Sequence, residues 1–305
     1  MTTIDASSTQ CAERSDTLAL RSGAGAIFAQ GEAARRMVTA LGTHSPQLHQ
    51  VRALLERRGR RDQGRFSFEG PTLLAEAVAS GTQIEALYAT QRAYESLPAA
   101  LVESLSCPVY LISERALRKV SDLETPSGVL AVAATRFIEL DRLLSGGATA
   151  LLLARVADPG NAGTLLRSAE AFGVDGVLFD EEVVDAYNPK VVRASMGSIF
   201  RQRCAVVELQ ELAQKAHRER YALVATDRRG VPLPQFAFPE RCIIAVGHER
   251  TGLSGRHVEW DAAVAIPQEG KVDSLNAAMA GCIVLYEHAR QRRLRSSDVS
   301  TRNNA

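Results

Sequence analysis

Short apolar runs alternate with amphipathic stretches from Phe66 onward, and this pattern predicts a small α/β domain over 47–136. Pro71 in the first turn of one amphipathic stretch and Gly81 just beyond it are typical of a helix start and a helix end. The predicted helices cover 71–80 and 114–120, and the predicted strands cover 84–89, 109–112 and 128–134.

A second α/β unit begins with the apolar run 150–156, which predicts a buried strand. Strands and helices then alternate, so we expect a mainly parallel sheet covered by helices on both faces. Such sheets bind ligands at the carboxyl ends of their strands. Further strands are predicted at 176–179, 204–207, 221–225, 242–246 and 262–266, and helices at 162–172, 189–199, 209–219 and 274–290.

These patterns predict two domains and three connecting or terminal segments. We expect an N-terminal extension over 1–46, either mobile or a loosely docked helix, a linker over 137–148, a second domain over 149–291 and a polar C-terminal tail over 292–305.

The composition excludes several classes of protein. The formal net charge of +1 provides no global field for nucleic acid, so an RNA surface would need locally clustered charge. Five scattered cysteines without a CxxC pair argue against a disulfide framework or a zinc site and favour a reducing, cytoplasmic location. No apolar run is long enough for a membrane helix, and the polar N-terminus does not resemble a secretory signal.

One dense arginine run stands out in the first domain. As a charge run it is typical of a solvated helix face, whereas in a protein that binds nucleic acid it would supply phosphate contacts. The run comprises Arg52, Arg57, Arg58, Arg60, Arg61 and Arg65.

Three loops follow predicted strands of the second domain. In the first, Asn161 is a candidate helix N-cap, and Arg167 lies beside the buried stripe of that helix. In the second, two glycines frame Glu249, and glycine permits close approach of backbone to a ligand. In the third, Ser274 and Asn276 stand where a loop gives way to an apolar helix. Each alone is typical of an ordinary cap or surface residue.

Other enzyme signatures are missing from the sequence. No G-x-G-x-x-G follows a predicted strand, no G-x-x-x-x-G-K-[ST] is present, and no G-x-S-x-G elbow is present. A dinucleotide oxidoreductase, a nucleotide-triphosphate enzyme and a serine hydrolase are therefore poorly supported.

Taken together, these loops resemble the SpoU-type RNA ribose 2′-O-methyltransferases of the SPOUT class. The resemblance spans about 149–291, and Phe68-Glu69-Gly70 resembles the marker of the small RNA-binding domain that precedes this unit in many members. The matching motifs are Asn161-x-Gly163-x-x-x-Arg167, the stretch 187–200, Gly247-x-Glu249-x-x-Gly252-Leu253-Ser254, and Ile266-Pro267 with Ser274-Leu275-Asn276 and Leu285-Tyr286-Glu287.

The resemblance implies a trefoil-knotted catalytic domain, a homodimer with an active site completed across its interface, and S-adenosylmethionine as the cofactor. It implies cofactor binding by residues on three loops, namely Thr226, Val246, Gly247, Ile266, Leu275 and Ala280. The knot would be an exception to the rule that chains avoid threading.

The resemblance also implies that Arg167 activates the ribose hydroxyl. A guanidinium has a pKa above about 12, so Arg167 could act either as the base or by orienting the hydroxyl and stabilising the developing alkoxide. Asn161, Ser274 and Asn276 would hydrogen-bond this constellation, with Arg167 as the expected partner of the Ser274–Asn276 pair. Glu249 would fix the second loop or pair with an arginine.

Two departures from the family pattern stand in the third loop. Ala277-Ala278-Met279 replaces the Val-Ser-Val of many relatives, and Glu269 with Asp273 places acid near the expected substrate path. Ribosomal RNA is the expected substrate, for either ribosome maturation or antibiotic resistance. A tRNA methyltransferase and a catalytically idle RNA-binding or ribosome-assembly factor are the alternatives.

Overall fold

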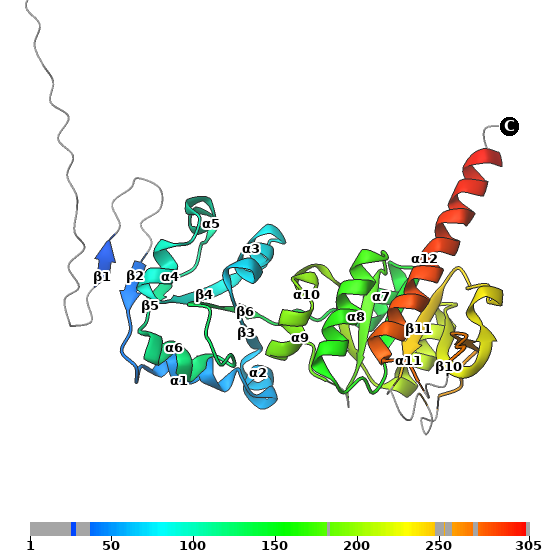
Figure 1. Cartoon of the computed structure of the whole chain (residues 1–305), viewed down its shortest axis with the longest axis horizontal. Helices are drawn as coiled ribbons and strands as arrows, with labels where there is room; N and C mark the ends of the chain where they lie inside the picture. Colours follow the sequence, from blue (N-terminus) through cyan, green and yellow to red (C-terminus); the bar gives the residue numbers. More distant parts are fainter. Residues whose placement is uncertain are drawn as a thin grey trace, which may run out of the picture.

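Two six-stranded sheets, set one after the other along the long axis of the molecule, organise the chain (Figure 1). The computed structural model describes residues 26–28, 37–181, 184–247, 253, 258–270 and 274–302. No helix among these residues is both long and apolar enough to cross a membrane.

The first sheet is mixed, with strand order β1-β2-β5-β4-β6-β3. On one face Leu48 and Leu117 pack against Tyr88, and on the other face Leu74 packs in the cluster that contains Phe66. The elements are β1 (Ala26–Phe28), β2 (Met37–Ala40), α1 (Pro46–Ala53), α2 (Arg57–Gln63), β3 (Arg65–Glu69), α3 (Pro71–Ala79), β4 (Ile84–Ala89), α4 (Gln91–Glu95), α5 (Ala99–Ser104), β5 (Val109–Leu111), α6 (Glu114–Val120) and β6 (Val129–Ala134).

Three strands of this sheet, β1, β2 and β3, were not predicted. β2 lies in the stretch expected to be a mobile extension or a loosely docked helix, yet it pairs in parallel with β5 and buries Val38. β3 pairs antiparallel with β6 and buries Phe66 and Phe68. The predicted helix after Gly70 is confirmed: Gly70 has φ 111°, Pro71 opens α3, and Gly81 has φ 70° beyond its end.

The second sheet is parallel throughout, which confirms the expectation of a mainly parallel sheet. Its strand order, which was not predicted, is β12-β10-β11-β7-β8-β9. Leu151 and Leu153 of the central strand face a core shared with α8 and α12, whereas Leu152 faces α7 and α11. Burial on both faces explains the unbroken apolar run of this strand. The elements are α7 (Leu140–Ser145), β7 (Thr149–Leu153), α8 (Pro159–Ala171), β8 (Gly176–Asp180), α9 (Pro189–Ala194), α10 (Ser198–Arg201), β9 (Cys204–Val207), α11 (Leu209–Arg218), β10 (Ala222–Pro232), the 3-10 turn η1 (Leu233–Gln235), β11 (Cys242–Val246), β12 (Ala262–Ala265) and α12 (Ala277–Arg302).

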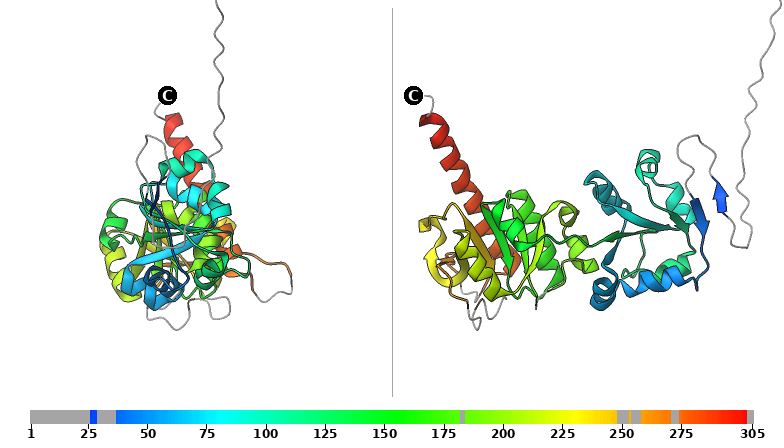
Figure 2. Two further views of the ribbon diagram at one scale, coloured as in Figure 1. Left: turned by 90° about the vertical axis from the view of Figure 1, so that its left-hand side faces the viewer. Right: turned by 180° about the vertical axis from the view of Figure 1, so that it is seen from behind.

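Two predicted helices of this domain have different bounds in the structure. The helix predicted over 189–199 is broken into α9 and α10, because Met196 and Gly197 take left-handed backbone conformations. The helix predicted over 274–290 begins at Ala277 and runs to Arg302, so most of the expected polar tail extends it. Figure 2 shows the end of α12 projecting beyond the body of the domain. Much of the second loop lies outside the described residues, and the knot stays a prediction.

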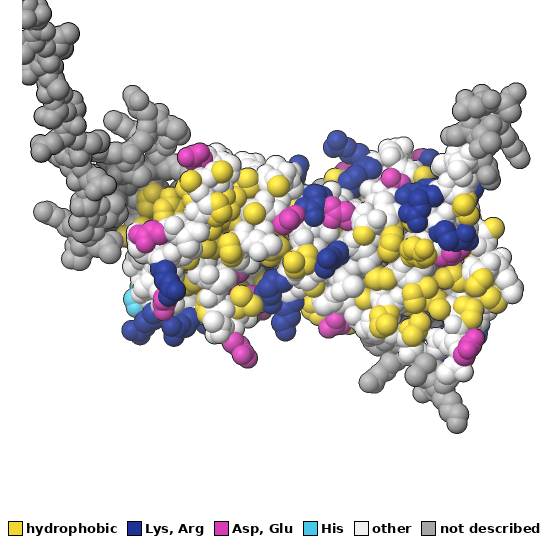
Figure 3. Space-filling view, turned by 45° about the horizontal axis from the view of Figure 1, so that its top comes forward, with side chains coloured by type: hydrophobic (Ala, Val, Ile, Leu, Met, Phe, Trp, Pro, Cys, Tyr) yellow, Lys and Arg dark blue, Asp and Glu magenta, His cyan; other side chains and the backbone are white. Residues whose placement is uncertain are grey.

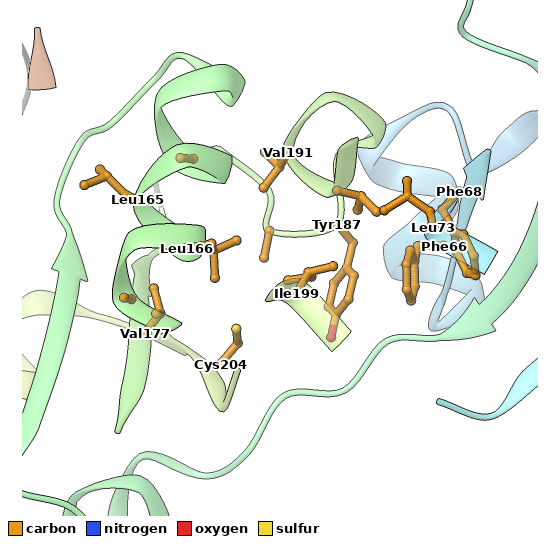
Figure 4. Packing of buried hydrophobic residues seen from close by; sticks show 14 of the residues in the cluster. Phe66, Phe68, Leu73, Leu165, Leu166, Val177, Tyr187, Val191, Ile199 and Cys204 are labelled. Carbon is orange, nitrogen blue, oxygen red and sulfur yellow. The ribbon is translucent and has the colours of Figure 1, made fainter. Parts of the chain in front are cut away.

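The two domains share one continuous apolar core. Phe66 lies 4.4 Å from Tyr187, and Phe68 lies 5.0 Å from Phe200, measured between ring centroids. Figure 4 shows Phe66, Tyr187 and Ile199 lying between β3 and the interior side of α8, where Leu166 is buried. The small domain is therefore packed directly onto the parallel-sheet domain.

Candidate active site

Asn161 lies in the first turn of α8, at the carboxyl end of β7. The prediction that Asn161 caps this helix was wrong. Asp158 is the N-cap, and its Oδ1 accepts a hydrogen bond from the backbone N–H of Asn161 at 2.7 Å. Pro159 occupies the first helical position, where its missing N–H is tolerated. The side chain of Asn161 is therefore not the cap of α8.

Asn276 caps α12 and contacts Asn161 at the same time. Its Oδ1 accepts hydrogen bonds from the backbone N–H groups of Ala278 and Met279, at 2.9 and 3.2 Å. Its Nδ2 donates to Oδ1 of Asn161 at 3.0 Å. This hydrogen bond joins two of the predicted site residues, 115 positions apart in the sequence. It also brings the N-terminal ends of two helices together.

Small and shape-matched side chains hold α8 against α12. A Cβ atom added to Gly281 would lie 2.3 Å from Cδ2 of Leu165, so a larger residue here would force the side chain of Leu165 to shift. One turn on, Ser168 Oγ lies 2.8 Å from Cys282 Sγ, and Phe172 meets Tyr286 edge-on at 5.9 Å. This packing fixes the relative position of Asn161 and Asn276.

Arg167 is exposed on α8, and within the described part of the chain it forms no hydrogen bond or ion pair. The expected hydrogen bond from Arg167 to Ser274 or Asn276 is not present among the described residues, where Nδ2 of Asn276 donates to Asn161. Ser274 is exposed just before the cap. Glu249 and Asp273 lie outside the described residues, whereas Glu269 is described and exposed.

The predicted cofactor residues lie within β10, at the ends of β11 and β12, and where α12 begins. Thr226 lies inside β10, just before a register shift in its pairing with β12, and its Oγ1 donates to the carbonyl of Ala245 in β11 at 2.9 Å. Val246 and Gly247 are buried at the end of β11, and Ile266 is half-buried just after β12. Leu275 and Ala280, on either side of the α12 start, are also half-buried.

Two features near the site were missed from the sequence. The cap at Asp158 had a readable signal, because Asp before Pro is typical of a helix start. Arg155, just after β7, has a φ of 63°, which is uncommon for a residue with a side chain. Nothing in the local sequence indicates this conformation.

The arginine run divides into two groups. Arg52, Arg58 and Arg61 are exposed on α1 and α2, as an RNA surface requires. Arg60 is 3% exposed, and Arg57 donates to the backbone carbonyl of Glu181, across the domain junction.

The prediction that Arg60 contacts RNA was wrong, because its guanidinium is used within the protein. Arg60 Nε donates to Asp185 at 2.7 Å, and Arg60 Nη1 donates to the carbonyls of Leu54 and Leu55. Arg65 remains half-exposed but is ion-paired with Glu85 at 2.5 Å.

A parallel sheet with polar side chains at its carboxyl edge places this chain among the α/β proteins that bind ligands there. Residues 148–286 match the model of the SpoU rRNA Methylase family, and residues 45–131 match an MRM3-like substrate binding domain. An uncharacterized tRNA/rRNA methyltransferase of Synechocystis is 34% identical over 259 residues, which cover 82% of this chain and 93% of the relative. The chain belongs to the SpoU rRNA methylase family.

A second relative and a solved structure are also similar to this chain. A 23S rRNA (uridine(2479)-2′-O)-methyltransferase of Streptomyces viridochromogenes is 31% identical over 272 residues, covering 85% of this chain and 93% of the relative. Among solved structures, the SpoU methyltransferase AviRb from the same organism, in complex with the cofactor AdoMet, superposes with a TM-score of 0.74. That pair is 30% identical and covers 82% of this chain and 98% of AviRb.

Proposed function

We propose that this chain transfers a methyl group from S-adenosylmethionine to a ribose 2′-hydroxyl of ribosomal RNA. The observation that carries the proposal is the hydrogen bond from Asn276 to Asn161, which unites the first and third family motifs at one edge of the sheet. The names of the relatives, which specify 23S rRNA and 2′-O-methylation, support the substrate and the reaction.

The residues proposed for the cofactor suit its adenosine moiety. S-adenosylmethionine supplies an electrophilic methyl group on a positively charged sulfonium. Thr226, Val246, Gly247, Ile266, Leu275 and Ala280 are all uncharged. Their apolar side chains and backbone groups are suited to an adenosine moiety, which is recognised by shape and by hydrogen bonds.

We assign Arg167 to the ribose and its adjacent phosphate. Its exposed guanidinium can donate a hydrogen bond to the hydroxyl oxygen and stabilise negative charge on it; because a guanidinium is a poor base, the hydroxyl proton passes to solvent water. The N-terminal ends of α8 and α12 meet at the Asn161–Asn276 pair and carry partial positive charge. Both helix ends would stabilise the same developing alkoxide.

Replacing Arg167 with alanine tests this assignment. We expect the methylation rate to fall by about 100-fold or more, because a positioned cation is lost from the reacting oxygen. Calorimetry should show S-adenosylmethionine binding unchanged. Thr164→Ala, an exposed substitution on the same helix, is the matched control. Full methylation by Arg167→Ala would remove Arg167 from the mechanism.

The substrate class is tested by incubating total rRNA and tRNA with labelled S-adenosylmethionine and mapping the modified ribose. Label in rRNA supports the proposal, and label confined to tRNA replaces it with the tRNA alternative. Failure to bind S-adenosylmethionine at all would support the idle RNA-binding factor.

We further propose a homodimer formed through α12. Met279, Ile283 and Tyr286 are 58%, 40% and 52% exposed, and their spacing places them on one face of the helix. Apolar side chains gather on this side of the domain in Figure 3, which is unusual for a surface facing water. Sedimentation velocity should give a dimer for the natural chain and a monomer for Ile283→Glu with Tyr286→Glu. A monomeric natural chain would contradict the proposal.

A further inference from the structure

The segment 184–202, which contains α9 and α10, lies between the two sheets and contacts both domains (Figure 1). On one side α9 packs against β3 of the small domain, and on the other it packs along α8. It therefore offers a direct physical route from the small domain to the helix that carries Asn161 and Arg167.

Charged hydrogen bonds tie this segment to the small domain. Nη1 of Arg193, on α9, donates to both carboxylate oxygens of Asp122 at 2.7 Å. The two side chains are 28% and 22% exposed, so water screens this ion pair only in part. At the start of the segment, the buried guanidinium of Arg60 holds Asp185.

The second anchor is Arg201 of α10. Its Nη1 donates to Glu76 of the small domain at 2.5 Å, and its Nε pairs with Glu170 of α8. Hydrogen bonds from Arg201 lower the pKa of Glu170, which keeps this carboxylate ionised and able to hold α8. One arginine thus links the small domain to the far end of the catalytic helix.

Between α9 and α8 the contact is made at the backbone. A Cβ atom added to Gly163 would lie 2.4 Å from Cβ of Ala194 and 2.6 Å from the carbonyl oxygen of Val191. Gly163 sits between Asn161 and Arg167 on α8. A displacement of α9 cannot be absorbed by flexible side chains here, so it must move α8.

We infer that α9 couples the small domain to α8, and that Arg193 and Asp122 are a positioning pair for methyl transfer. This inference rests on the proposed function. The pair touches no reacting group; it sets the position of Asn161 and Arg167 relative to RNA held by the small domain. Methyl transfer requires close alignment of the attacking oxygen, so a small shift of α8 lowers the rate.

The test compares Asp122→Ala, Arg193→Ala and the charge-exchanged double variant Asp122→Arg with Arg193→Asp. Glu114→Ala is the matched control, because it removes the carboxylate of an ion pair that lies within the small domain only. We expect each single variant to lower the single-turnover rate at saturating RNA by about 10-fold. S-adenosylmethionine affinity should stay unchanged, and the double variant should recover most of the rate.

Unchanged single-turnover rates in the single variants would overturn the inference, as would a lower rate that the charge-exchanged variant does not restore. A decrease in RNA affinity without a decrease in this rate would also overturn it, since Arg193 would then be an RNA contact. Amide hydrogen exchange of α8 gives a readout independent of activity. We expect faster exchange near Asn161 in both single variants and recovery in the double variant. Inactivity of the natural chain would reject the proposed function alone, whereas unchanged exchange would reject the coupling.

Discussion

Asn276 has two separate roles that belong to different atoms. Its Oδ1 caps α12 by accepting from two backbone N–H groups, and its Nδ2 donates to Asn161. An N-cap oxygen satisfies donors that the helix itself cannot pair. The site role needs a donor, which only the amide half of the side chain provides. A substitution can therefore remove one role and keep the other.

Asn276→Asp and Asn276→Ala separate the two roles. Aspartate caps a helix as well as asparagine does, so we expect little change in the free energy of unfolding. Alanine removes the cap and should cost about 1 kcal/mol. Both variants lose the donor to Asn161 and should lose most activity. Denaturant unfolding and methylation rates check this, and an active Asn276→Asp variant would show that the contact is dispensable.

The sequence could predict the identities of site residues but not their partners. Family spacing pointed to Asn161 and Asn276, whereas their mutual hydrogen bond depends on two distant helices meeting. The cap was misplaced because Asp158 and Asn161 both suit a helix start, and Pro159 decides between them. Arg60 looked like its exposed neighbours because its partner, Asp185, lies 125 residues away in the chain.

At the scale of elements, α12 shows how tertiary contacts set helix bounds. Arg292 donates to the carbonyls of Phe172 and Gly173, and Arg295 donates to the carbonyl of Phe238. These bonds support the helix well past 290, where local polarity suggested a tail.

Strands such as 84–89 and 242–246 were predicted at their observed bounds, because burial makes their apolar runs distinct.

α12 also carries a buried histidine that makes the fold sensitive to acid. His288 is 2% exposed; its Nε2 lies 3.3 Å from Thr149 Oγ1, and its Nδ1 has no hydrogen-bond partner among the residues that the structure describes. Burial, with Arg292 and Arg295 nearby and Asp175 opposing them, lowers the pKa of His288 to about 4. Its ring meets Phe238 edge-on, so the site suits a neutral imidazole.

The free energy of unfolding should therefore fall as the pH drops. Unfolded His288 titrates near its ordinary pKa of about 6.5, so between pH 6.5 and 4 the unfolded state binds more protons. We expect the free energy of unfolding of the natural chain to fall by roughly 2–3 kcal/mol across this window because of His288. The His288→Gln variant should not show this decrease. Urea unfolding at several pH values measures the difference, with exposed His217→Gln as the control. If the free energy of unfolding depends on pH in the same way in His288→Gln and in the natural chain, His288 is not the cause of the acid sensitivity.

At the scale of the whole molecule, the basic face of the small domain should set RNA affinity. Arg52, Arg58 and Arg61 are exposed on α1 and α2, and Lys and Arg side chains gather along one side of this domain in Figure 3. We propose that they contact phosphates. Arg60 is excluded from this set because it holds the domains together.

Changing Arg52, Arg58 and Arg61 together to glutamine should weaken RNA binding and reduce its salt dependence. Each lost phosphate contact lowers the slope of log affinity against log salt by about 0.7–0.9. S-adenosylmethionine binding should not change. Arg92→Gln, exposed on α4 across the sheet, is the control. An unchanged salt slope in filter-binding measurements would show that these three arginines do not contact RNA phosphates.

The order of strands in the parallel sheet has a consequence for the chain as it is synthesised. β7 is central, with β8 on one side and β11 on the other, although β11 is made much later. Until β11 leaves the ribosome, the wholly apolar stretch Ala150–Leu153 presents an open edge, which invites mispairing between nascent chains. Asn276 emerges later still. The growing polypeptide thus carries its most aggregation-prone edge for a long interval before it can acquire any activity.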